Sequence, residues 1–122
     1  MDFDEAISAH SAWKRTLKLY LSKPDHSLAA ADVALDDRCK LGEWIAGDGR
    51  KYSALPEFAT LRAQHTRFHQ AAGSIVSRAD RGEDISGELV PGSNSEFSQA
   101  TAQVIRALID MKKKVSGSVV CE

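Results

Sequence analysis

Apolar residues recur at intervals of three and four positions along most of the chain, which is the spacing typical of amphipathic α-helices. Segments with Pro, Gly or both at positions 22–25, 47–49 and 81–92 interrupt this pattern and separate four long stretches. Alternating β-branched and polar residues, which would indicate strands, are missing. The pattern therefore predicts an all-α fold, arranged as an antiparallel four-helix bundle with short connecting loops.

The first two predicted helices each carry one metal-competent side chain on the face assigned to the core. The first helix covers residues 2–21, and the second covers residues 27–46 with Ser27 as its N-cap. His10 lies in the apolar stripe of the first helix, and Cys39 lies in that of the second. The first stripe consists of Phe3, Ala6, Ile7, Trp13, Leu17, Tyr20 and Leu21, and the second of Leu28, Ala31, Leu35, Cys39, Gly42 and Ile45 or Ala46.

Two more histidines face the core from the third predicted helix. This helix begins at Pro56, a residue suited to the first helical position. The fourth helix begins at Ser93, which forms a capping box with Glu96. The third stripe contains Phe58, Leu61, His65, Phe68, His69, Ala72, Ile75, Val76 and Ala79, and the fourth contains Phe97, Thr101, Val104, Leu108, Met111 and Val115.

The core-facing histidines and cysteine have the chemistry of a metal site. His65 and His69 are four residues apart on one helix, so their side chains can bind one ion together. His10 and Cys39 can reach the same ion from facing helices, and three imidazoles with one thiolate complete a tetrahedral zinc shell. A single buried His is more often a hydrogen-bonded core residue, and a single buried Cys is usually inert. All four on apolar faces favour metal binding.

The surrounding residues argue against a catalytic metal. The segment from His65 to His69 lacks the glutamate that zinc peptidases place after their first histidine. The Glu-x-x-His pairs of di-iron bundles are also missing. Four protein ligands leave no open position for water, which a catalytic zinc site requires. Thiolate and imidazole together favour zinc, with copper as the main competitor, so we expect a structural or sensory zinc site.

Composition sets the remaining limits. The 122 residues are enough for a single domain over residues 1–122, and the net charge of −1 does not favour nucleic-acid binding. No apolar run is long enough to span a membrane, and the acidic start of the chain does not resemble a secretion signal. The cysteines, Cys39 and Cys121, do not form a disulfide framework. We therefore expect a cytoplasmic protein that binds neither membranes nor nucleic acids.

These motifs together resemble the chemoreceptor zinc-binding (CZB) domain family. The matching residues are His10 with Trp13, then Cys39-x-Leu41-Gly42-x-Trp44, then His65-x3-His69, with Glu43 at a position where the family often has Lys. The resemblance implies a bacterial cytoplasmic regulatory domain whose three-His, one-Cys site binds zinc. Such domains are usually fused to chemoreceptors or diguanylate cyclases and can form homodimers. In them, zinc occupancy or oxidation of the zinc-bound Cys controls output.

Three functions follow from this interpretation, in order of preference. The first is a zinc-dependent or redox-dependent sensor that acts through a protein partner, in a chemoreceptor or diguanylate cyclase pathway. The second is a structural zinc site in a protein–protein interaction module. The third, a hydrolytic enzyme, is disfavoured by the missing glutamate. Because 122 residues leave no room for an output domain, we expect either a free-standing member or an excised domain.

Overall fold

The computed structural model describes residues 2–22, 28–35, 39–89 and 94–120, and regular structure within these ranges is entirely helical. The all-α class predicted from the sequence is confirmed. The elements are α1 (Phe3–Ser22), α2 (Ala30–Val33), α3 (Lys40–Ala46), α4 (Pro56–Asp80) and α5 (Glu96–Val120), with short 3₁₀ helices η1 (Asp48–Tyr52) and η2 (Ser86–Leu89). Within the described ranges, no helix is long and apolar enough to cross a membrane.

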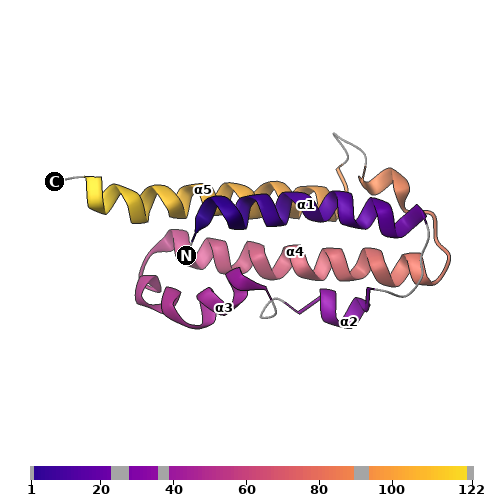
Figure 1. Ribbon diagram of the computed structural model, residues 1–122, viewed down its shortest axis with the longest axis horizontal. Coiled ribbons are helices and arrows are strands. Elements are labelled where there is room, and N and C mark those ends of the chain that lie inside the picture. Colours follow the sequence, from indigo (N-terminus) through magenta and orange to yellow (C-terminus); the bar gives the residue numbers. More distant parts are fainter. Residues whose placement is uncertain (1, 23–27, 36–38, 90–93, 121–122) are drawn as a thin grey trace.

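Three long helices form the body of the molecule (Figure 1). The helices α1 and α4 run in the same direction, and α5 runs against both of them (Figure 1). The helix α5 packs along both α4 and α1. The short helix α2 packs mainly against α4. The short helices α2 and α3 therefore lie on the side of α4 that α5 leaves open (Figure 1).

The prediction of one continuous second helix over residues 27–46 is wrong. The described part of this stretch contains α2, a single turn, and α3, which has seven residues. Ala31 is exposed and Leu35 is 41% exposed, so the predicted stripe does not face the core there. Val33 is buried instead. Ser27 lies outside the described residues.

Cys39 lies at the start of α3, after this break. Its backbone is extended, with φ −97° and ψ 165°, and it serves as the N-cap of α3 rather than as a residue of the helix interior. Its sulfur accepts a hydrogen bond from the backbone N–H of Gly42. Apolar spacing cannot distinguish a continuous helix from two short ones on the same axis. The four-helix bundle thus stays a prediction, because α2 and α3 replace the expected fourth long helix.

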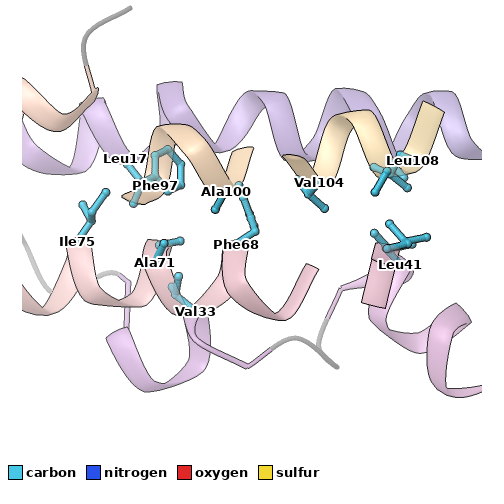
Figure 2. Close-up of a cluster of buried hydrophobic side chains, with 14 of the residues drawn as sticks. Leu17, Val33, Leu41, Phe68, Ala71, Ile75, Phe97, Ala100, Val104 and Leu108 are labelled. Atoms are coloured by element: carbon cyan, nitrogen blue, oxygen red, sulfur yellow. The ribbon is translucent and has the colours of Figure 1, made fainter. Parts of the chain in front are cut away.

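The core lies between the three long helices and continues under α2 and α3 (Figure 2). Every residue of the predicted stripe of α4 is buried, which confirms the interpretation of that segment. The core side chains labelled in Figure 2 come from every α-helix: Leu17, Val33, Leu41, Phe68, Ala71, Ile75, Phe97, Ala100, Val104 and Leu108. A core that spans all the elements holds α4 rigidly, and α4 carries both His65 and His69.

The start of α5 differs from the predicted capping box. Ser93 lies outside the described residues, and α5 begins at Glu96. The hydroxyl of Ser95 accepts the backbone N–H of Ser98 at 3.2 Å, so Ser95 caps the helix. The Glu96 carboxylate instead pairs with Arg67 on α4. Two serines near one helix start offer two registers, and the tertiary contact of Glu96 favours the later one.

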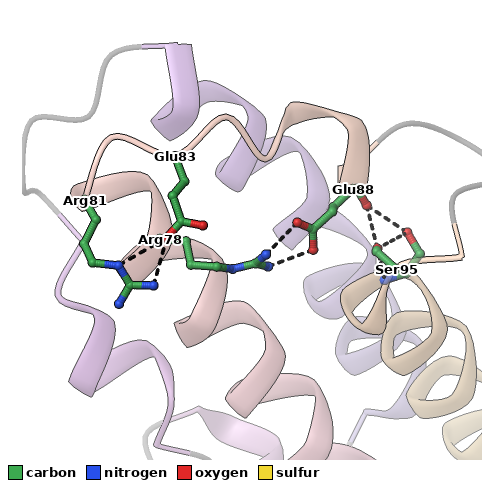
Figure 3. Close-up of polar contacts among 6 residues, drawn as sticks. Arg78, Arg81, Glu83, Glu88 and Ser95 are labelled. Carbon is green, nitrogen blue, oxygen red and sulfur yellow. Dashed lines mark hydrogen bonds and ion pairs between the residues drawn. The ribbon is translucent and has the colours of Figure 1, made fainter.

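Ion pairs at the other end of α4 fix the turn that leads to α5 (Figure 3). Arg78 binds both carboxylate oxygens of Glu88 at 2.7 Å. The carbonyl of Glu88 accepts the hydroxyl of Ser95 at 2.7 Å, which links η2 to the cap of α5 (Figure 3). Tyr20 at the end of α1 donates to Asp80 at 2.6 Å. These contacts set the relative positions of α1, α4 and α5.

Candidate metal centre

The four metal-competent residues predicted from the sequence lie together at one point of the fold. His10 comes from α1, Cys39 from the residue before α3, and His65 and His69 from successive turns of α4. One donor atom from each residue lies within 4.8 Å of the corresponding atoms of the other three. The three histidines are buried, and Cys39 is half-buried. The cluster thus joins three segments that are far apart in the sequence.

The spacing of the donor atoms suits a small tetrahedral metal ion. The sulfur of Cys39 lies 3.2 Å from Nε2 of His65 and 3.7 Å from Nε2 of His69. Zinc bonds of about 2.0 to 2.3 Å at tetrahedral angles place neighbouring ligand atoms about 3.3 to 3.8 Å apart. The widest separation in the cluster is larger than this, so small side-chain movements would bring all four donors to one ion. The residues fit a zinc ion.

Backbone hydrogen bonds turn two of the imidazoles toward the cluster. Nδ1 of His10 donates to the carbonyl of Ala6 at 2.8 Å, and Nδ1 of His69 donates to the carbonyl of Val33 at 3.0 Å. In each ring the other nitrogen, Nε2, then carries the lone pair with which a histidine binds a metal. Orientation by a backbone carbonyl is the usual arrangement of a metal-binding histidine.

Nε2 of His10 is the strongest single sign that something is bound here. This atom is buried and has no hydrogen-bond partner among the described residues. A buried acceptor without a partner costs about 1 to 3 kcal/mol, so native structures rarely contain one. A bound cation would satisfy the lone pair. The orientation of His10 would therefore suit a metal ion at Nε2.

Burial also keeps His10 in the protonation state that binds metals. Loss of solvent lowers the pKa of His10 below its ordinary value, the hydrogen bond to Ala6 raises it, and charge on the nearby His69 lowers it again. The net direction is down. The ring is consequently neutral at pH 7, and neutral imidazole is the form that coordinates metal ions.

Cys39 lies at the start of α3 rather than inside a helix, and its sulfur nevertheless lies beside the three histidines. The backbone N–H of Gly42 points at the sulfur of Cys39, with 3.4 Å between nitrogen and sulfur. The same sulfur lies near Nε2 of both histidines of α4. A peptide N–H directed at sulfur stabilises negative charge on it. In this cap conformation the sulfur of Cys39 lies toward α4.

An aromatic side chain packs against one side of the cluster. The ring of Phe68 lies 5.1 Å from that of His10, centroid to centroid. Trp44 of α3 packs edge-on against Phe3 of α1, with ring centroids 5.5 Å apart. A low-polarity surround strengthens every charge interaction inside the cluster.

A cavity of about 790 Å³ connects the cluster with the surface. His10 and Cys39 line this cavity, as do Asp4 and Glu5 in the first turn of α1. The cavity gives small molecules and ions a path to the sulfur. Asp36, three residues before Cys39, lies outside the described residues, as do His26 and Cys121.

Sequence reasoning missed the backbone groups that orient the ligands. The carbonyls of Ala6 and Val33 and the N–H of Gly42 bind His10, His69 and Cys39, respectively. For His10 the sequence could have indicated this partner, because the carbonyl of Ala6 lies four residues earlier in the same predicted helix. No such signal exists for Val33, because its contact depends on how α2 folds onto α4.

Comparison with known proteins agrees with this geometry. The family model described as the chemoreceptor zinc-binding domain matches residues 10–76, which is more than half of the chain. The matched span begins at His10 and contains Cys39, His65 and His69. No curated protein and no solved structure matches the chain. The chain therefore belongs to the chemoreceptor zinc-binding domain family.

Proposed function

We propose that this protein is a zinc-binding regulatory domain whose ion is held by His10, Cys39, His65 and His69. The observation that carries the proposal is the buried Nε2 of His10, which lacks a partner among the described residues and lies with three other donors. Three imidazole nitrogens and one sulfur are a donor set that prefers zinc to magnesium or calcium. The family to which the chain belongs is named for zinc, which supports the same ion.

The same donor set favours regulation over catalysis. Four protein donors fill a tetrahedral shell and leave no position for a substrate or an activated water. Bound zinc would hold the sulfur of Cys39 as a thiolate. We accordingly propose that the protein has no enzymatic activity of its own. Its effect would pass to a protein partner of the chemoreceptor or diguanylate cyclase kind, with the domain acting in the cytoplasm as a homodimer.

Cys39 is the residue through which an oxidant would act. It is half-buried and borders the cavity, whereas the three histidines are buried. The thiolate sulfur attacks one oxygen of hydrogen peroxide, and the O–O bond breaks. That oxygen and its proton stay on the sulfur as sulfenic acid, while the other oxygen leaves as hydroxide and takes up a proton from solvent to become water. Sulfenic acid is a weaker ligand than thiolate, so the link through the metal between the start of α3 and α4 would weaken. A protein partner would then respond to the changed position of α3.

Two alternatives remain distinct from this proposal. Zinc occupancy itself, rather than oxidation, is the signal if cellular zinc exchanges at the site. A purely structural zinc site in an interaction module would hold its ion permanently. The open cavity beside Cys39 favours exchange or reaction over permanent burial, because an enclosed site would give no path to the sulfur.

An oxidant titration distinguishes these functions. The zinc-loaded protein is treated with stoichiometric peroxide or hypochlorous acid in the presence of a zinc-release dye, and Cys39 and Cys121 are then analysed by mass spectrometry. Redox sensing predicts zinc release in step with modification of Cys39. Zinc fully retained with Cys39 oxidised, or zinc released with Cys39 intact, contradicts it. A zinc chelator added without oxidant separates rapid exchange from a permanently held ion.

A further inference from the structure

The backbone of the short helix α2 contacts the metal cluster. The carbonyl of Val33, the last residue of α2, accepts the Nδ1–H of His69 at 3.0 Å. The bond is buried, and the Val33 side chain is itself 8% exposed beside it. A single turn of helix is too short to be stable alone, so its position depends on what it packs against. That surface is α4.

Gly73 allows α2 to lie this close to α4. A Cβ atom at position 73 would lie 2.7 Å from Cβ of Ala34 and 3.0 Å from the carbonyl oxygen of Ala30. Real Cβ atoms do not make contacts as short as the first of these, so α2 would have to move away. Gly73 is buried and lies one helical turn beyond His69 on α4. The glycine costs about 1 kcal/mol of helix stability relative to alanine, which suggests that the close contact has a function.

We propose that α2 is a positioning element of the metal site, held against α4 by the contact between Gly73 and Ala34. This inference rests on the proposed zinc site. The Val33 carbonyl fixes the His69 ring with its proton on Nδ1, which leaves Nε2 directed at the other donors. When α2 moves away, the ring can rotate and either nitrogen can carry the proton. Gly73 is therefore a positioning residue, because it acts on the metal only through α2 and His69.

Thermodynamic linkage makes the relationship reciprocal. If docked α2 raises the zinc affinity of the site, bound zinc must stabilise docked α2 by the same factor. Coordination at Nε2 makes the Nδ1–H a stronger donor, which is the physical route for this coupling. The amides of Val33 and Ala34, which are hydrogen-bonded to Ala29 and Ala30 within α2, report on docking.

A double-mutant cycle tests the contact. The zinc dissociation constant is measured by chelator competition for the wild type, Gly73→Ala, Ala34→Gly and the double variant. Ser74→Ala, at the neighbouring exposed position of α4, is the control for helix propensity. We expect Gly73→Ala to weaken zinc binding about tenfold or more, as changes in the partners of ligand histidines do, and Ser74→Ala to leave it unchanged. In the Ala34→Gly background, where the closest clashing atom is missing, the Gly73→Ala effect should be much smaller.

Two further readouts separate positioning from general loss of structure. The ¹⁵N chemical shifts of the His69 ring should show a proton fixed on Nδ1 in the wild type and a mixture of tautomers in metal-free Gly73→Ala. Hydrogen exchange at Val33 and Ala34 should slow in the wild type when zinc binds. Equal zinc affinity of Gly73→Ala and the wild type, equal losses in both backgrounds, or exchange that zinc does not change would overturn the inference. A wild-type protein that binds no zinc would instead overturn the proposed function.

Discussion

The sulfur of Cys39 lies 3.2 Å from Nε2 of His65, and this contact joins the start of α3 to the middle of α4. The two residues are 26 positions apart in the chain. Among the described residues between α1 and α3, the only helix is the single turn of α2. A metal shared by these atoms would therefore act as a crosslink between the start of the short helix α3 and the long helix α4. The stability of the protein should therefore depend on the metal.

Removal of the metal should lower stability without abolishing the helices. The core residues of α1, α4 and α5 lie mostly outside the cluster, so the metal-free chain retains enough buried apolar surface to stay folded. A thousandfold excess of free zinc over its dissociation constant adds about 4 kcal/mol to the free energy of unfolding. Thermal melting followed by circular dichroism should thus show a midpoint about 10 °C or more higher with zinc than with chelator. Identical midpoints in samples whose metal contents differ would contradict the crosslink.

Stability of the metal-free protein should fall as the pH is lowered. Burial lowers the pKa of His10 in the folded chain below the value of 6.5 that it has when unfolded. The unfolded state therefore takes up the proton first, and stability is lost as the pH falls through about 6.5. Urea midpoints of metal-free protein at pH 7.5 and 5.5 measure the loss. In His10→Gln, which cannot titrate at this position, the difference between the two midpoints should shrink, and an unchanged difference would refute this origin.

The cap of α5 gives a prediction that is independent of the metal. The Ser95 hydroxyl accepts the Ser98 N–H and donates to the Glu88 carbonyl, so both bonds disappear in Ser95→Ala. We expect that variant to lose about 1 kcal/mol of unfolding free energy, as other N-cap serines do. Ser95→Thr keeps the hydroxyl and should retain most of the stability. Denaturant unfolding measures both variants, and equal losses in the two would show that the hydroxyl is not responsible.

The sequence predicts α4 and the cluster well, for a physical reason. Over 25 residues of α4, Pro56 marks the start and the apolar spacing assigns His65 and His69 to the buried face. A long, strongly periodic helix has one way to face a core. His10 is predicted for the same reason from α1. That these residues meet follows from the face each occupies, together with the chelating distance between two histidines on successive turns.

The region from α2 to α3 could not be predicted from periodicity. Its apolar spacing suits a continuous helix, but the chain leaves the helical conformation before Cys39, where the sulfur takes the cap position instead. Contacts with α4, such as the hydrogen bond between His69 and Val33, stabilise this broken arrangement. These contacts form only when the fold is complete. Spacing records which side of a segment is apolar. It does not record which backbone groups a distant side chain will bind.

Zinc content of single-alanine variants tests the central claim most directly. The purified protein and its His10→Ala, Cys39→Ala, His65→Ala and His69→Ala variants are equilibrated with the same buffered free zinc, and bound zinc is measured by elemental analysis. His26→Ala and Cys121→Ala are matched controls of the same residue types. We predict one zinc ion per chain in the wild type and both controls, and weakened binding in each of the four cluster variants. Full zinc at wild-type affinity in His10→Ala or Cys39→Ala, or its loss in His26→Ala, would contradict the assignment.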